Sequence, residues 1–312
     1  MAMDVVLHIG AHLCATSTFQ DYLSRNHARL SAAGCAAWAP RRTRHALFAG
    51  LLPERATPPR PGAVERAIGR IRLNLAAQSE AGTRHLVVSD PDMMGAVRAN
   101  LRLGTLYCGV GERMARLARA FEGYPLRLML NIRALDAYWA SGLAQAIPRG
   151  AGLPAAQRLA RLACGRTGWR EVVEEVACAL PGADLTVLPF ETFGGRPEAQ
   201  LEQMVPLAAP VQYARSWISA TPRLPELRAW LGAEAAALPE GAGRWQPFSP
   251  EQGAALREAY ADDIMWLAGG ANGLARLAPD PDKTQAGTAP PQSDLTRGRR
   301  DEQQDRRLAG TG

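Results

Sequence analysis

The sequence predicts an α/β protein with a mostly parallel sheet of about five strands flanked by helices. Short apolar runs alternate with longer stretches in which apolar residues recur every three or four positions, which is typical of strands alternating with amphipathic helices. The apolar runs are nearly continuous, so we expect a sheet covered by helices on both faces. The chain has 312 residues and is 47% hydrophobic, which suits one domain of about 250–280 residues followed by a tail.

Five runs are predicted to be strands. The first ends at Gly10, and the second contains Cys35 and stops at Pro40, which favours a place at the edge of the sheet. The five predicted strands cover residues 5–9, 35–40, 84–90, 126–132 and 184–190.

The stretches between and after these runs are predicted to be helices. From Thr16, for example, Phe19, Tyr22, Leu23 and Leu30 fall on one helical face. The predicted helices cover residues 16–30, 64–75, 110–121, 135–147, 169–176, 198–205, 224–237 and 250–267.

Two stretches lack either pattern. Residues 51–62 are rich in proline and are predicted to form a loop. Residues 279–312 contain almost no large apolar side chains, so this tail is predicted to be disordered. The predicted organisation is therefore one α/β domain, residues 1–278, followed by a disordered tail, residues 279–312.

The charge of the chain is basic and comes almost entirely from arginine. The formal net charge is +6 and Lys283 is the only lysine. The arginines are scattered and lack interleaved aromatic residues, so no nucleic-acid partner is expected, whereas a small anionic ligand matches the charge. The first apolar run is too short for a signal peptide or a membrane span. We therefore expect a cytoplasmic protein with no membrane span.

The five cysteines do not form a metal-binding or disulfide pattern. Their number is odd, their spacing is wide and no CxxC motif occurs. These features predict reduced, mostly buried thiols and no metal site.

The loop after the first strand has the composition of a phosphate-binding loop. A strand, a turn that begins at Gly10 and a helix N-terminus together present unpaired N–H groups and a positive dipole end. Thr16, Ser17 and Thr18 add hydroxyl donors. A Walker A loop would have Gly and Lys where Ala15 and Thr16 stand, so ATP or GTP hydrolysis is disfavoured. An ordinary capped helix after a core strand is the alternative interpretation.

A second candidate for anion binding follows the fourth predicted strand. Arg133 comes directly after that strand, and Ser141 follows eight residues later, about two turns into the next helix. An arginine fork and a hydroxyl so placed can hold a phosphate from the side. Ligands of parallel α/β sheets bind beyond the carboxyl ends of the strands, where the loops at 10–18, 89–95 and 133 onward are expected to meet.

Five segments together resemble the bacterial sulfotransferase family. They are "LHIGAH…ATSTFQ", "LVVSDPDMMG", "NIRALDAYWASGLAQAI", "LTVLPFETF" and "YADDIMWL", in the family's order. The resemblance implies a P-loop-type three-layer fold and 3′-phosphoadenosine 5′-phosphosulfate (PAPS) as the sulfuryl donor, with no metal. It implies a small-molecule, lipid or carbohydrate acceptor with a hydroxyl or amine.

The resemblance also assigns roles to individual residues. It implies that the first loop holds the 5′-phosphosulfate and that the Arg133–Ser141 pair holds the 3′-phosphate. Trp217 and Arg215 fall where family members make late contacts to the nucleotide. The loop residues so assigned are Gly10, Ala11, Cys14, Ala15, Thr16, Ser17 and Thr18.

The chain departs from the family pattern at Leu13, which stands where the family loop has a lysine. That lysine is expected to stabilise charge on the bridging oxygen as the sulfuryl group leaves. Losing one such donor costs about 10²–10³-fold in rate. Either another cation covers the site, for which Arg25, Arg41, Arg42 and Arg44 are candidates, or the chain is a catalytically impaired PAPS-binding protein with a sensing or assembly role. A kinase-like phosphotransferase is a further, disfavoured alternative.

Two residues are candidates for the base that accepts the acceptor's proton. His12 lies on the first loop, and Asp90 ends the third predicted strand, where the family has an acidic residue. Asp90 could equally cap the next turn. His8 is expected to be a hydrogen-bonded core histidine. Cys14 follows the strand near a helix N-terminus, but no motif supports a cysteine nucleophile.

Overall fold

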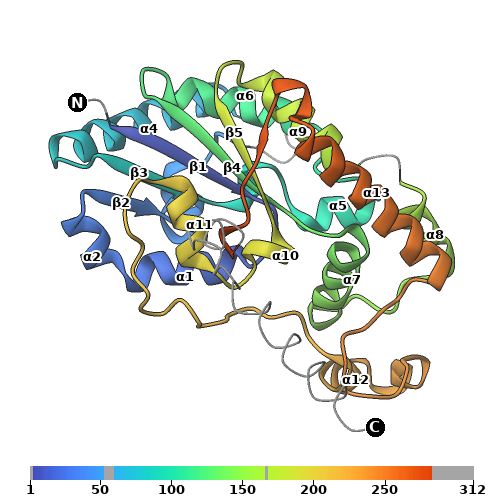
Figure 1. Ribbon diagram of the computed structural model, residues 1–312. Coiled ribbons are helices and arrows are strands. Elements are labelled where there is room, and N and C mark those ends of the chain that lie inside the picture. Colours follow the sequence, from blue (N-terminus) through green and yellow to red (C-terminus); the bar gives the residue numbers. More distant parts are fainter. Residues whose placement is uncertain (1–2, 53–59, 166–167, 283–312) are drawn as a thin grey trace, which may run out of the picture. The chain divides into compact units, whose positions relative to one another are not determined.

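The runs predicted as strands pair into one sheet in the computed structural model (Figure 1), which describes residues 3–52, 60–165 and 168–282. All pairings in this sheet are parallel and the strand order is β2-β3-β1-β4-β5-β6. The predicted fold class is confirmed, with one short strand more than expected. The strands are β1 (Asp4–Gly10), β2 (Cys35–Trp38), β3 (His85–Ser89), β4 (Leu126–Ile132), β5 (Asp184–Pro189) and β6 (Arg276–Leu277).

The order places β1 in the middle of the sheet and β2 at an edge, as its terminal proline predicted. β1 pairs with β3 and β4, with Val5 in register with Leu86 on one side and Leu126 on the other. The loops that follow these three adjacent strands therefore leave the same edge of the sheet side by side. Pro40 does not extend β2 but begins the short helix α3 (Pro40–Arg42), which leads into η1 (Thr43–Leu47).

Helices cover both faces of the sheet, which explains why β1 is nearly continuous in apolar residues between Asp4 and Gly10, with His8 the exception (Figure 1). Side chains alternate across a strand, so Val5 and Leu7 pack on one side and Val6 on the other. The first side is covered mainly by α4 (Ala63–Glu80), α6 (Val110–Phe121), α7 (Leu135–Ala146), α9 (Trp169–Ala179) and α13 (Pro250–Ala268). The second side is covered by α1 (Thr16–Arg25), α2 (His27–Ala32) and α11 (Pro197–Met204).

Several helices differ from the prediction. The apolar face expected over 16–30 is shared by α1 and α2, which meet at Asn26. The helix expected over 224–237 ends at Leu231, where Gly232 breaks it into α12 (Leu224–Leu231) and the 3₁₀ segment η4 (Gly232–Ala237). The other unpredicted elements are α5 (Val97–Leu103), α8 (Ala156–Ala163), α10 (Phe190–Phe193), η2 (Pro91–Met93), η3 (Ile147–Arg149) and η5 (Ala271–Gly273).

The contacts within the chain divide it into two units, Met1–Ala278 and Pro279–Gly312. Most of the tail that was predicted to be disordered, and residues 53–59 of the predicted proline-rich loop, lie outside the described residues. In the described part of the chain, no helix has the length and apolar character needed to cross a membrane.

The cysteines are free thiols, as expected, but their burial differs from the prediction. Cys14 and Cys35 are buried, whereas Cys108, Cys164 and Cys178 are exposed. Cys108 precedes α6, Cys164 caps the C-terminus of α8 and Cys178 lies on the exposed side of α9. The spacing of the cysteines in the sequence did not indicate which of them would be exposed.

Candidate functional site

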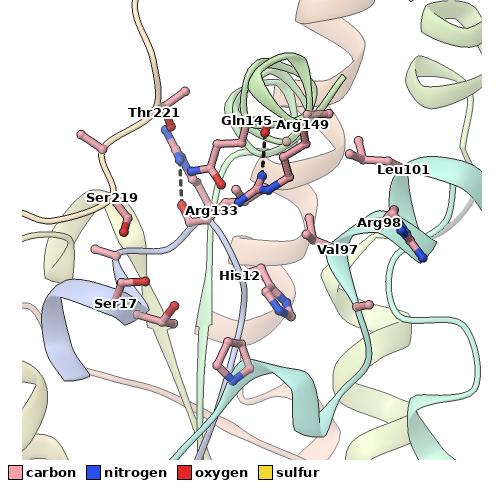
Figure 2. Close-up of a pocket in the computed structure, with 18 of the residues that line it drawn as sticks. His12, Ser17, Val97, Arg98, Leu101, Arg133, Gln145, Arg149, Ser219 and Thr221 are labelled. Carbon is pink, nitrogen blue, oxygen red and sulfur yellow. Dashed lines mark hydrogen bonds between the residues drawn. The ribbon is translucent and has the colours of Figure 1, made fainter. Parts of the chain in front are cut away.

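The loops after β1, β3 and β4 meet at the carboxyl edge of the sheet and line a cavity of about 930 Å³ (Figure 2). His12 comes from the first loop, Asp92 from the second and Arg133 from the third. This is the edge at which ligands of parallel sheets bind, and the volume is at the upper end of the range for small-molecule sites.

The first loop opens the N-terminus of α1 toward this cavity. Leu13 and Ala15 have left-handed backbones, with φ of 65° and 59°. Ala15 is the N-cap of α1 and supplies no side-chain hydrogen bond, and the first helical bond runs from the Phe19 N–H to the Ala15 carbonyl. The N–H groups of the first turn therefore have no helical acceptor. Ala15, Thr16 and Ser17 line the cavity, so these donors and the helix dipole are available to an anion.

Four other residues of the predicted loop, Gly10, Ala11, Thr18 and Cys14, do not line the cavity but pack behind the loop and fix its path. A Cβ at Gly10, where φ is 117°, would lie 3.0 Å from the Pro91 Cβ, so only glycine fits there. Ala11 is buried and its N–H bonds to the Asn131 carbonyl at 2.8 Å. Thr18 is buried, and its hydroxyl accepts the N–H of Ile218 at 3.2 Å. These side chains support the loop rather than line the cavity.

Cys14 is the fourth of these supporting residues. It is fully buried, and burial raises the pKa of its thiol to about 12. The thiol therefore stays protonated at neutral pH, which agrees with the absence of a cysteine-enzyme motif.

Arg133 brings a buried positive charge to the same cavity. Its side chain is 4% exposed, and its Nη1 donates to the Leu13 carbonyl at 2.8 Å. The guanidinium lies 4.3 Å from the centre of the Phe190 ring, and its Nε has no hydrogen-bond partner among the described residues. Burial lowers the pKa of Arg133, and the charge of Arg244 adds to this effect. An anionic oxygen at this point would accept a hydrogen bond from the unpartnered Nε and would neutralise the buried charge.

Ser141 does not join Arg133 at the cavity wall. It is 3% exposed inside α7, while the next residue, Gly142, lines the cavity. Gln145, one turn further along α7, also lines the cavity, so the serine lies at the margin of the cavity-facing side of the helix but is not part of the wall. A Cβ at Gly142 would lie 3.3 Å from the Leu13 Cδ1, which shows that Leu13 packs against this face of α7.

His12 belongs to a hydrogen-bond chain that runs from the cavity wall at Asp92 into the buried interior at Tyr107. Its Nε2 lies 2.9 Å from an oxygen of Asp92, and its Nδ1 lies 3.0 Å from the Tyr107 hydroxyl. Because the carboxylate only accepts, Nε2 carries the proton and Nδ1 accepts from Tyr107. Tyr138 donates to Tyr107 at 3.2 Å, and Asn100 donates to Tyr138 at 2.9 Å. Each of these groups has a partner, so the chain fixes the orientation of the His12 ring.

Asp92 is the only carboxylate among the described residues that line this cavity. Burial raises its pKa, but the hydrogen bond and charge of His12 and the charges of Arg44 and Arg113 outweigh burial, so the pKa is lowered. Arg44 Nε lies 3.0 Å from its second oxygen. A carboxylate offers about four acceptor sites, so Asp92 can still accept a hydrogen bond from a ligand.

Asp90, the other predicted base, lies away from the cavity wall. It is 1% exposed and accepts hydrogen bonds from Thr43, from Arg44 at 2.7 Å and from the N–H of Asp92 at 3.1 Å. Asp90 therefore caps η2, which is the alternative that the sequence left open. His8 is the expected core histidine: it is fully buried between Ser89 at 2.8 Å and Asn131 at 2.6 Å, and burial lowers its pKa to about 4.

The cavity wall is strongly cationic. Of the four candidates to replace the missing lysine, only Arg44 lines it, and this residue is paired with Asp90 and Asp92. Arg25 pairs instead with Asp21. Among the described residues, the arginines that line the cavity are Arg44, Arg98, Arg102, Arg133, Arg149, Arg158, Arg223 and Arg244.

The segment after α11 closes one side of the cavity. Trp217, Ile218 and Ser219 line it, whereas Arg215 pairs with Glu198 at 2.7 Å and does not. Of the two predicted late contacts, only Trp217 lines the cavity. In the described part of the chain, no three metal-ligating side chains are grouped to hold a metal ion.

Comparisons with known proteins found no relative of this chain: no family model, curated protein or solved structure matches it.

Proposed function

We propose that the protein binds PAPS in this cavity and transfers its sulfuryl group to a hydroxyl or amine of an acceptor molecule. The observation that carries the proposal is that the open N-terminus of α1 and the buried guanidinium of Arg133 face one cavity. A nucleotide with phosphate groups at both the 5′ and 3′ positions would use both of these features. The resemblance of five segments to the sulfotransferase family supports the choice of sulfuryl over phosphoryl transfer.

In this proposal the first loop holds the 5′-phosphosulfate. The N–H groups and hydroxyls of Thr16 and Ser17 bind its oxygens, and the helix dipole favours their charge. Arg133 binds the 3′-phosphate through the donors that Leu13 leaves free. Trp217, which is half-exposed at the cavity wall, offers its ring to the adenine.

The acceptor's proton passes to the Asp92–His12 pair. Asp92 is within the cavity, and His12 holds one of its oxygens at 2.9 Å. Sulfuryl transfer resembles phosphoryl transfer, where positioning and charge stabilisation dominate, so a carboxylate with a lowered pKa is sufficient to orient the hydroxyl and take its proton late in the reaction.

A catalytically impaired PAPS-binding protein is the second candidate function. It is favoured by Leu13, whose side chain packs on α7 at Gly142 and provides no charge at the bridging oxygen. Arg44, the one predicted substitute in the cavity, is held by two carboxylates.

The test is release of 3′-phosphoadenosine 5′-phosphate (PAP) from PAPS by the purified protein, with PAP binding measured in parallel. We expect PAP to bind and PAPS to be consumed faster than in buffer. Binding without turnover would favour the impaired protein. The absence of PAP binding would refute both candidates.

A further inference from the structure

Four arginines from α5, η3 and α8 line the cavity in addition to those of the first loop's surroundings. Figure 2 shows Arg98 and Leu101 of α5 across the cavity from Ser17 and Ser219, with His12 between the two sides. We call Arg98, Arg102, Arg149 and Arg158 the α5 arginine cluster; all four line the cavity.

Three of these arginines are tied to α5, and the fourth lies on η3 at another part of the same cavity wall. Arg98 and Arg102 are four residues apart on α5, so they lie on one face of the helix with Cβ atoms about 5–6 Å apart. Arg158 of α8 donates to the Leu101 carbonyl at 3.3 Å, which ties it to the same helix. Arg149 ends η3 and donates to the Gln145 carbonyl at 2.6 Å.

The fold does not account for this concentration of charge. Among the ion pairs of the described residues, none includes a member of the cluster. Like charges four residues apart destabilise a helix. Arg149 and Arg158 each make one backbone contact, but Arg98 and Arg102 hold no fold element together. A bound anion would remove the repulsion.

We propose that the α5 arginine cluster binds the anionic groups of the acceptor, so that the acceptor carries at least two carboxylate, phosphate or sulfate groups besides the group that is sulfated. This inference rests on the proposed function. The donor's phosphates are assigned to the loop and to Arg133, so they do not account for the cluster. Asp92 and His12, which take the acceptor's proton, line the same cavity, where Val97 and Leu101 provide apolar contacts for the carbon skeleton.

Guanidinium forks bind carboxylates and tetrahedral anions bidentately, so the probes are small polyanions of both kinds. Tripolyphosphate and citrate are titrated calorimetrically into protein that has been saturated with PAP, which blocks the donor site. The test variant is Arg98→Gln/Arg102→Gln. The control is Arg29→Gln/Arg116→Gln, which removes the same charge from helices that do not line the cavity.

We expect at least one probe to bind the wild-type protein, and to bind the α5 variant at least about 10-fold more weakly. The control should stay within about threefold, and the melting temperatures of all three proteins should agree. The stronger of the two probes identifies carboxylate or phosphate as the preferred group. The inference is overturned if neither probe binds, or if test and control variants lose affinity equally.

PAP is titrated first into each protein, so the two proposals fail separately. If PAP does not bind the wild type, the proposed function and the role of the cluster in an acceptor site fall together. If PAP binds and the probes show no dependence on α5, only the inference about the acceptor falls.

Discussion

Replacing Arg133 with methionine should weaken the binding of PAP and leave that of 5′-AMP nearly unchanged. Methionine keeps an unbranched apolar stem against Phe190, over whose ring the guanidinium lies at 4.3 Å, and removes the charge. In our account that charge meets the 3′-phosphate, which 5′-AMP lacks. The variant therefore separates the two nucleotides by the one group in which they differ.

The size of the effect follows from the surroundings of Arg133. A hydrogen bond to a charged group contributes about 1.5–3 kcal/mol, which corresponds to about 10–150-fold in the dissociation constant for PAP. The variant also loses the bond from Nη1 to the Leu13 carbonyl at 2.8 Å. That bond contributes about 1 kcal/mol to the free energy of unfolding, so the melting temperature should fall by only a few degrees.

The assay is calorimetric titration of both nucleotides into the wild type, Arg133→Met and Arg215→Met. Arg215 is a matched control because it is paired with Glu198 outside the cavity. Equal losses for PAP and 5′-AMP would refute the reasoning, because they would mean that Arg133 acts only by holding the Leu13 loop. An unchanged affinity for PAP would place the 3′-phosphate elsewhere.

Asp92→Asn should lower the rate of sulfuryl transfer by about 10²-fold or more, the range for a lost general base, with PAP affinity almost unchanged; a rate equal to that of the wild type would exclude Asp92 as the proton acceptor. Leu13→Lys should raise PAP release from PAPS by about 10²-fold, after a melting curve has shown that the new charge is tolerated beside α7; no gain would show that position 13 is not limiting. His8 is buried in its neutral form, with its pKa lowered to about 4 from the ordinary histidine value of 6.5. Its contribution to stability is therefore complete above pH 6.5 and is lost as the pH falls toward 4. The free energy of unfolding should therefore lose about 3 kcal/mol more between pH 6.5 and 4 in the wild type than in His8→Gln, and parallel curves would contradict this.

The strands of this fold were predictable because both faces of the sheet are covered. A run such as Val5–Ile9, which is apolar except for His8, is typical of a strand with helices packed on both sides, and β1 occupies such a place in the structure. β6 could not be predicted, because it is two residues long and its pairing with β5 is set by the path of the chain after α13. α5 was missed because its seven residues show only one apolar repeat, Val97 and Leu101.

The site was predictable where sequence order alone determines it. The loops that follow parallel strands share an edge, so His12 and Arg133 were expected together, and both line the cavity. The sequence could not show which of Asp90 and Asp92 faces the cavity. Asp90 is turned inward by hydrogen bonds from Thr43 and Arg44, which lie more than 40 residues away in the chain. Tyr107 lies 95 residues from His12, with no local motif to connect them.

The cationic wall of the cavity was also hidden in the sequence. Arg149, Arg158 and Arg244 come from separate elements, and only the packing of α5, α7 and α8 brings the first two to one surface. In the sequence they belong to a uniform scatter of arginines. A ligand-binding role could be distinguished from an ordinary charged surface only after the fold had shown which guanidiniums lack carboxylate partners.

We propose that the cavity recognises a nucleotide by its 3′-phosphate as well as by its 5′ group. The most direct measurement is a pair of calorimetric titrations of the wild-type protein, one with PAP and one with 5′-AMP, at the same ionic strength. We expect PAP to bind at least about 10-fold more tightly than 5′-AMP, the smallest difference expected from one charged hydrogen bond. Equal affinities, or no binding of either nucleotide, would contradict it.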